Sequence, residues 1–132
     1  MRYRTMMLFP VVFVLAVLAS GTPAHAQPDC PRNSLCLYDG LNFTGELLIL
    51  PGGEAESDLD RRDFGDRTSS VFNSSTAPGA LYDDTDFKDR KICVFPGTGI
   101  ANLGSDAYKF NNKASSASAP YTPRCGGGTP GR

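Results

Sequence analysis

Two seven-residue stretches concentrate side chains that could bind a metal ion through oxygen atoms. Residues 110–116 read Phe-Asn-Asn-Lys-Ala-Ser-Ser, and residues 64–70 read Phe-Gly-Asp-Arg-Thr-Ser-Ser. Calcium takes roughly six to eight oxygen ligands, including carboxylates, amides, carbonyls and hydroxyls. Short Asn, Asp and Ser side chains suit that ion, but they also hold loops together without metal. The two stretches therefore leave calcium binding and simple loop stabilisation as alternatives.

A second cluster of oxygen atoms comes from four aspartates in one turn, at positions 83, 84, 86 and 89. The turn lacks the Gly and the closing Glu of an EF-hand loop, so we interpret it as solvated. Paired carboxylates can hydrolyse glycosides, but a chain this short has little room for a substrate cleft and contains no tryptophan. We therefore expect no enzymatic activity.

The first 26 residues have the features of a secretory signal peptide. Arg2 and Arg4 form a basic start, an apolar run follows over residues 6–19, and residues 24–26 read Ala-His-Ala, a cleavage signature. The alternative is a membrane anchor, for which the apolar run is short. We expect cleavage before Gln27 and a secreted protein.

Cleavage would remove the only histidine, His25, and two of the 13 basic residues. Without histidine, Ser-His-Asp triads, Cys-His dyads and histidine-ligated zinc sites are excluded. The mature chain would carry 11 basic and 14 acidic residues, a balance of −3. Nothing in this balance indicates a nucleic-acid partner.

The four cysteines of the exported chain indicate disulfides, because their spacing does not repeat a Cys-x2-Cys metal pattern. Three pairings are possible. We favour Cys30 with Cys36, which would close a short N-terminal loop, and Cys93 with Cys125, which would attach the C-terminal tail to the second half. Each bond would stabilise the fold by about 2 to 4 kcal/mol.

The elements that must position these groups are strands. Five segments have strand patterns bounded by turn residues, and they are 35–38, 46–50, 68–72, 80–82 and 91–95. Residues 54–62 show little periodicity and predict a connecting loop with at most one helical turn. Residues 73–78 predict a polar linker.

The second half of the chain repeats the landmarks of the first. Offsets of 44 and 46 residues align the pairs Tyr38 and Tyr82, Phe43 and Phe87, Leu59 and Leu103, and Ser69-Ser70 and Ser115-Ser116. Two copies of a four-strand unit in an all-β chain imply a sandwich of two sheets.

The repeat resembles the βγ-crystallin family, whose Greek-key signature is Tyr or Phe, four residues, Phe or Tyr, one residue, and Gly. The matching residues are Tyr38, Phe43 and Gly45 in the first copy, and Tyr82 and Phe87 in the second. Asp89 stands where the second glycine is expected. The resemblance implies an all-β, βγ-crystallin-like sandwich of two Greek-key motifs.

This resemblance also divides the chain. We expect a signal peptide at 1–26, a single monomeric domain at 27–125 and a flexible Gly-rich tail at 126–132. Within the domain, the first Greek key would cover about 34–77 and the second about 79–120.

The family's calcium motif is Asn/Asp, Asn/Asp, two free positions, Ser/Thr and Ser. Residues 111–116 match every position, whereas residues 65–70 begin with Gly. In the family each ion lies between the two loops. The resemblance implies one Ca²⁺ site from Asn112, the Lys113 carbonyl and Ser69, and another from Asp66, the Arg67 carbonyl and Ser115. With so few charges, we expect an affinity in the micromolar range or weaker.

A narrower resemblance concerns the segments Cys30-x5-Cys36-Leu37-Tyr38 and Arg90-Lys91-Ile92-Cys93-Val94. They are similar to the βγ-crystallin-like family of secreted metalloproteinase inhibitors. Such an inhibitor presents a rigid segment to the protease cleft, which reduces the ordering cost of binding. Carried over, the inhibitory segment is Cys93, Val94, Phe95, Pro96 and Gly97. The family closes this segment with a nearby cysteine, whereas here the favoured partner is the distant Cys125.

The leading hypothesis is therefore a secreted inhibitor of an extracellular protease, of the metalloprotease class, with no nucleic-acid partner and no membrane contact after cleavage. In the simplest alternative, residues 92–95 only fill strand positions, and the protein is a calcium-binding structural or envelope-associated module. A secreted antimicrobial β-protein is a third possibility.

Overall fold

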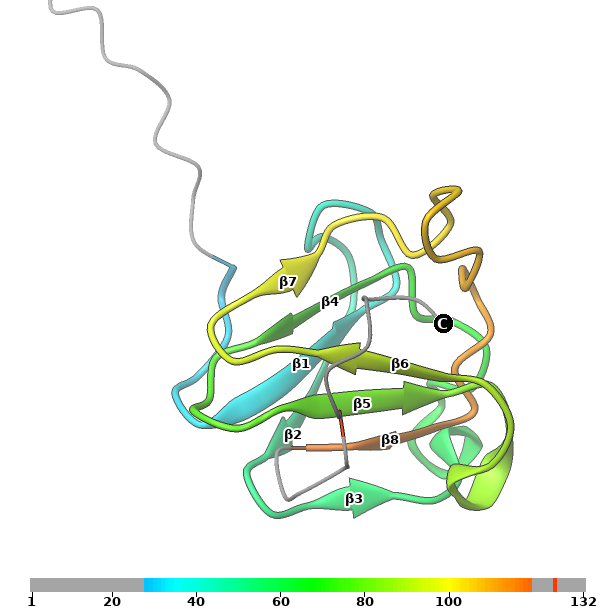
Figure 1. Cartoon of the computed structure of the whole chain (residues 1–132), viewed down its shortest axis with the longest axis horizontal. Coiled ribbons are helices and arrows are strands. Elements are labelled where there is room, and N and C mark those ends of the chain that lie inside the picture. Colours follow the sequence, from blue (N-terminus) through cyan, green and yellow to red (C-terminus); the bar gives the residue numbers. More distant parts are fainter. Residues whose placement is uncertain (1–27, 120–124, 126–132) are drawn as a thin grey trace, which may run out of the picture.

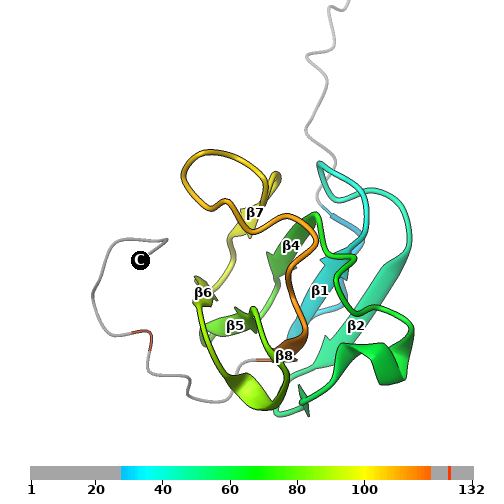
Figure 2. The ribbon, with the colours of Figure 1, turned by 90° about the vertical axis from the view of Figure 1, so that its right-hand side faces the viewer.

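The computed structural model of the protein describes residues 28–119 and Cys125. Two antiparallel four-stranded sheets make up the domain, with strand orders β2-β1-β4-β7 and β3-β8-β5-β6 (Figures 1 and 2). The strands are β1 (Ser34–Tyr38), β2 (Leu47–Pro51), β3 (Ala55–Glu56), β4 (Ser70–Asn73), β5 (Gly79–Tyr82), β6 (Lys91–Val94), β7 (Gly99–Ile100) and β8 (Ser116–Ser118). Two short 3-10 helices, η1 (Leu59–Arg62) and η2 (Thr85–Phe87), lie in the connections. The predicted all-β sandwich of two Greek-key motifs is confirmed.

The two halves of the chain exchange one strand each. β7, from the second half, pairs with β4 in the register Val71 to Ile100. β3, from the first half, pairs with β8 in the register Glu56 to Ala117. Each sheet is therefore completed by a strand from the other motif.

The core fills the space between the inner faces of the two sheets. Alternate residues of β2 and β6 point inward, as the burial of Leu48, Leu50, Ile92 and Val94 shows. The largest buried side chains include Leu35, Leu37, Leu59, Phe64, Leu81, Leu103 and Phe110. Burying a side chain of this kind contributes about 1.5 to 3 kcal/mol, so the core is the main source of stability.

The hairpin after β1 and the hairpin after β5 have the same internal contacts. The rings of Tyr38 and Phe43 meet edge to face at 5.9 Å, and Phe43 N–H donates to Ser70 Oγ at 2.9 Å. In the second copy the corresponding rings are 5.6 Å apart, and Ser116 Oγ accepts from Phe87 N–H at 3.0 Å. Ser70 of β4 thus holds the first hairpin closed, and Ser116 of β8 holds the second.

Glycine is needed in the first hairpin but not in the second. Gly45 has φ +84°, and an added Cβ would collide with the Asp39 carboxylate. Asp89, at the equivalent place, adopts φ 62°. Aspartate tolerates the left-handed region better than most residues, so the second hairpin keeps its turn without glycine.

Three local predictions need correction. The predicted loop 54–62 contains strand β3, because β3 finds its partner β8 about sixty residues away in sequence, whereas η1 is the single helical turn that the prediction allowed. The strand predicted at 68–72 lies at Ser70–Asn73. Asn73, predicted to begin a linker, is therefore the last residue of a strand.

Both favoured cysteine pairings are confirmed. Cys30–Cys36 is the N-terminal disulfide, and Cys93–Cys125 is the tail disulfide. Within the described residues no helix is long and apolar enough to cross a membrane. The predicted signal peptide at 1–26 and the tail at 126–132 lie outside the described residues.

Candidate functional site

The two regions that the sequence singled out lie at opposite ends of the sandwich. The loops that lead into β4 and β8 lie at the right-hand end of Figure 1, together with η1 and η2. The turn that joins β6 to β7 lies at the left-hand end, on the same side as the first described residues. The two regions can therefore be considered separately.

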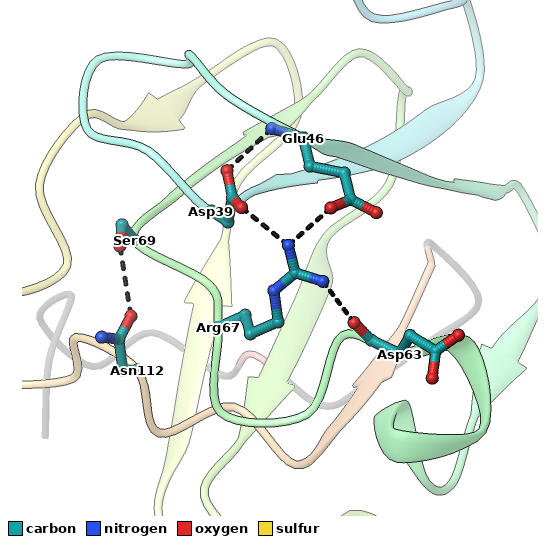
Figure 3. Close-up of polar contacts among 6 residues, drawn as sticks. All are labelled: Asp39, Glu46, Asp63, Arg67, Ser69 and Asn112. Carbon is teal, nitrogen blue, oxygen red and sulfur yellow. Dashed lines mark hydrogen bonds and ion pairs between the residues drawn. The ribbon is translucent and has the colours of Figure 1, made fainter.

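The loops before β4 and β8 are crossed, as the repeat predicted. Ser69 Oγ donates to Asn112 Oδ1 at 3.2 Å, a contact that Figure 3 shows. Ser115 Oγ donates to Asp66 Oδ1, also at 3.2 Å. The structure thus brings together the side chains of each predicted calcium ligand set, one serine from one loop and one Asn or Asp from the other.

Backbone hydrogen bonds hold the crossed loops in register. Asp66 N–H donates to Ala114 O at 3.0 Å, and Asn112 N–H donates to Thr68 O at the same distance. One set offers an amide, a hydroxyl and a carbonyl oxygen, and the other offers a carboxylate, a hydroxyl and a carbonyl oxygen. In the described part of the chain, no group of three or more His, Cys, Asp or Glu side chains is placed to hold a metal ion. The oxygens fit a weakly held calcium ion and no softer metal.

Arg67 forms an ion-pair network beside these loops (Figure 3). Its Nη2 lies 2.8 Å from Asp39 Oδ2 and 2.5 Å from Glu46 Oε2, and its Nη1 donates to Asp63 O. The hydrogen bond from Arg67, followed by that from the Glu46 backbone N–H, lowers the pKa of Asp39. Hydrogen bonds to Glu46 and Asp39 raise the pKa of Arg67. The guanidinium charge is thus balanced by carboxylates and does not oppose a cation at Asp66.

At the other end of the sandwich, one part of the predicted inhibitory segment lies in the core and another part lies at the surface. Val94 is 1 % exposed and packs between the sheets, so its side chain cannot reach a partner. Cys93 points outward and is held by the tail disulfide. Phe95 is half-buried, whereas Pro96 and Gly97 are exposed. The surface available to a partner is therefore the turn at residues 95–98, which we call the β6–β7 turn.

The β6–β7 turn is closed by its own hydrogen bonds. Phe95 O accepts from Thr98 N–H at 3.2 Å and from Thr98 Oγ1 at 2.8 Å. Gly97 has φ +67°, a conformation that side-chain-bearing residues adopt at a cost. Glycine at this position therefore avoids backbone strain in the turn.

Asn73, which the sequence reasoning missed, anchors this turn from strand β4, the neighbour of β7 in the same sheet. Its N–H donates to Thr98 O at 2.9 Å and its carbonyl accepts from Gly97 N–H at 2.9 Å. Its side chain is fully buried, and Nδ2 donates to Val94 O at 2.8 Å. These partners lie more than twenty residues away, so no local pattern identifies the role. The only sequence signal is an amide directly after a predicted strand.

The next residue, Ser74, anchors the N-terminal loop in the same way. Its N–H donates to Ser34 O at 2.9 Å, and its carbonyl accepts from Asn33 N–H at 3.2 Å. Its hydroxyl donates to Pro31 O. Two consecutive residues at the end of β4 therefore hold two separate surface segments, the β6–β7 turn and the loop closed by the N-terminal disulfide.

A hollow of about 320 Å³ lies between these two segments. We call it the end hollow, and its lining residues are Pro28, Cys30, Arg32, Phe72, Ser74 and Gly97. Phe72 is fixed by an edge-to-face contact with Phe43 at 5.9 Å between ring centroids. The hollow is thus formed by a disulfide, an aromatic pair and a hydrogen-bonded turn, and it exists without a partner.

Comparison with known proteins gives a family and a fold. The sequence pattern of peptidase inhibitor family I36 matches residues 23–94, more than half of the chain. The chain is also 35% identical over 46 residues to a metalloproteinase inhibitor of Streptomyces nigrescens. That match covers 35% of this chain and 35% of the relative, so it spans about a third of the relative's length.

Solved structures share the architecture. A βγ-crystallin from Ciona intestinalis superposes with a TM-score of 0.57 at 26% identity, covering 65% of this chain and 98% of that one. A βγ-crystallin domain from Clostridium beijerinckii gives a TM-score of 0.54 at 22% identity, covering 67% and 99%. The βγ-crystallin fold and the predicted resemblance to peptidase inhibitors are therefore confirmed.

Proposed function

Because the chain belongs to peptidase inhibitor family I36, we propose that it is a secreted inhibitor of an extracellular metalloprotease. The named activity of the Streptomyces nigrescens relative supports the metalloprotease class. Two disulfides in a domain of this size are typical of exported proteins and support an extracellular site of action. Family membership also agrees with the prediction that the protein is not an enzyme.

The observation that carries the mechanism is the set of hydrogen bonds that hold the exposed β6–β7 turn. Asn73 holds it at Val94, Gly97 and Thr98, and the tail disulfide holds the strand that leads into it. A segment that is ordered before binding avoids a cost of about 0.5 to 1.5 kcal/mol for each side chain that would otherwise be immobilised. In this proposal Pro96 and Gly97 enter the protease cleft, while Cys93 and Val94 support them from below.

The first test is an inhibition assay with the mature, oxidised chain against secreted metalloproteases, serine proteases and cysteine proteases. We expect inhibition that saturates at one inhibitor per metalloprotease molecule. If a molar excess of folded protein inhibits none of these enzymes, the proposed function is rejected.

A matched pair of glycine variants tests the segment. Gly97 and Gly53 have φ +67° and +88°, and an added Cβ meets no atom within 4 Å at either position. Replacing either by Ala should cost about 1 to 2 kcal/mol of backbone strain. Gly53 follows β2, at the opposite edge of the sheet from β7. Gly97→Ala should weaken inhibition and Gly53→Ala should not; equal inhibition by both variants would show that another surface contacts the protease.

Calcium is a second candidate function, favoured by the crossed loops. Two oxygens 3.2 Å apart, as in the pairs Ser69–Asn112 and Ser115–Asp66, have a separation that ligands of one Ca²⁺ ion at about 2.3 to 2.6 Å can adopt. The carbonyls of Lys113 and Arg67 would complete the protein ligands of the two sites. Calcium would then link the two Greek keys and stabilise the domain.

This proposal is tested by thermal unfolding with CaCl₂ and, as a control, with MgCl₂. At 100 times the dissociation constant, calcium should add about 2.7 kcal/mol of stability. Ser69→Ala and Ser115→Ala should each reduce this gain, whereas Thr76→Ala, which removes an exposed hydroxyl group outside both loops, should leave it unchanged. An undiminished calcium response in both loop variants would contradict the ligand assignment.

A further inference from the structure

The end hollow contains one charged side chain. Arg32 is exposed, and no ion pair joins it to an acidic side chain among residues 28–119, which include the nearby Asp29. Arg67 and Arg90, in contrast, each have a carboxylate within 4 Å. The hollow therefore presents a positive charge that the described part of the chain does not neutralise.

The hollow and the β6–β7 turn share a wall, because Gly97 belongs to both. A protein that docks on Gly97 with an interface of ordinary size buries about 800 Å² on each partner, a patch about 16 Å in radius. Such a patch covers the adjoining hollow. A protease that binds the turn through an interface of this size and is centred on Gly97 would therefore also cover Arg32.

Covering Arg32 removes water from a group that stays charged. A guanidinium does not lose its proton in proteins, so it needs new acceptors when its water is displaced. A carboxylate matches its planar donors with two parallel hydrogen bonds. A basic or apolar surface at the same place would leave the charge buried without a partner, which is strongly unfavourable.

We infer that the end hollow receives an Asp or Glu side chain from the rim of the protease cleft, and that Arg32 pairs with it. This inference rests on the proposed function and adds a selection rule to it. The β6–β7 turn provides the contact with the cleft, and Arg32 selects proteases that carry an acidic residue beside that cleft. A protease with a basic rim is rejected by charge repulsion.

The test uses the metalloprotease that the wild-type chain inhibits best, with inhibition constants measured from 50 to 500 mM NaCl. Arg32→Gln should raise the inhibition constant at least about tenfold, and Arg32→Glu at least about a hundredfold, because removing one member of a covered charge pair leaves the protease carboxylate without its partner. Arg32→Gln should also remove most of the salt dependence. The matched control is Arg61→Gln, which removes the same charge from a side chain that is 70% exposed on η1, at the other end of the domain.

Each outcome has a distinct meaning. Inhibition that is unchanged in Arg32→Gln and Arg32→Glu overturns the inference and leaves the proposed function standing, whereas inhibition of no protease overturns both. If Arg32→Gln instead changes the sedimentation mass and leaves inhibition unchanged, the hollow is an interface between copies of the chain and the inference is wrong. Recovery of Arg32→Glu binding by an acid-to-lysine change on the protease rim would identify the paired carboxylate.

Discussion

The role of Asn73 predicts a large loss of stability on its replacement by alanine. The side chain makes four hydrogen bonds in the core: Nδ2 donates to Val94 O at 2.8 Å and to Ala77 O at 2.9 Å, and Oδ1 accepts from Ser75 N–H at 3.0 Å and Ser75 Oγ at 2.6 Å. A net contribution of about 1 kcal/mol for each bond gives a total of about 4 kcal/mol. Marginal stability makes this a large fraction of the free energy of unfolding.

The assay is urea unfolding of the oxidised mature chain, followed by circular dichroism. The matched control is Asn102→Ala, because the Asn102 side chain is exposed and accepts one hydrogen bond, from Gly104 N–H at 2.9 Å. That variant should lose about 1 kcal/mol or less. A loss below about 1.5 kcal/mol in Asn73→Ala would mean that the side chain contributes no more than one ordinary hydrogen bond, and only the backbone of Asn73 would then anchor the turn.

Three further predictions concern other parts of the fold. Thr68→Val should leave stability unchanged or raise it in urea unfolding, because Thr68 Oγ1 is fully buried and has no hydrogen-bond partner within residues 28–119; a clear loss would reveal a missed partner. The folded state lowers the pKa of Asp39, so ionised Asp39 contributes to the free energy of unfolding. This contribution should be complete above the unfolded pKa of about 4 and disappear as pH falls through the folded pKa. Arg67→Met should remove part of this loss of stability at low pH. Identical pH profiles of stability for the wild-type chain and the variant would contradict this prediction. Replacing both cysteines of the tail disulfide should cost about 3.7 kcal/mol and both of the N-terminal disulfide about 2.2 kcal/mol, from sequence separations of 32 and 6. The opposite order in urea midpoints would contradict the loop-closure argument.

The sequence was most informative where the relevant signal is local or repeated. The spacing from Tyr38 to Gly45, and its partial repeat from Tyr82 to Asp89, predicted both hairpins, because turn geometry depends on a few adjacent residues. The two Ser-Ser pairs at a common offset likewise predicted that the loops before β4 and β8 are equivalent. That each loop contacts the other was implied by the resemblance to the βγ-crystallin family, and the structure shows these crossed contacts.

Short strands with distant partners gave no such signal. β3 is two residues long, and its residues form a strand only because β8 offers hydrogen bonds from the other motif. Its own residues, Ala and Glu, have low strand propensity. The exchange of strands between the sheets therefore became visible only in the folded chain.

The sequence by itself thus determined the class of fold, the preferred cysteine pairing and the position of the exposed turn after β6. The tertiary structure alone decided that Val94 belongs to the core and that Asn73 and Ser74 hold the two segments around the end hollow. It also placed Arg32 beside Gly97, some sixty-five residues further along the chain. The physical reason is the same in each case. Hydrogen bonds and burial across the sandwich join residues that are far apart in sequence, and such contacts produce no periodic pattern in the sequence.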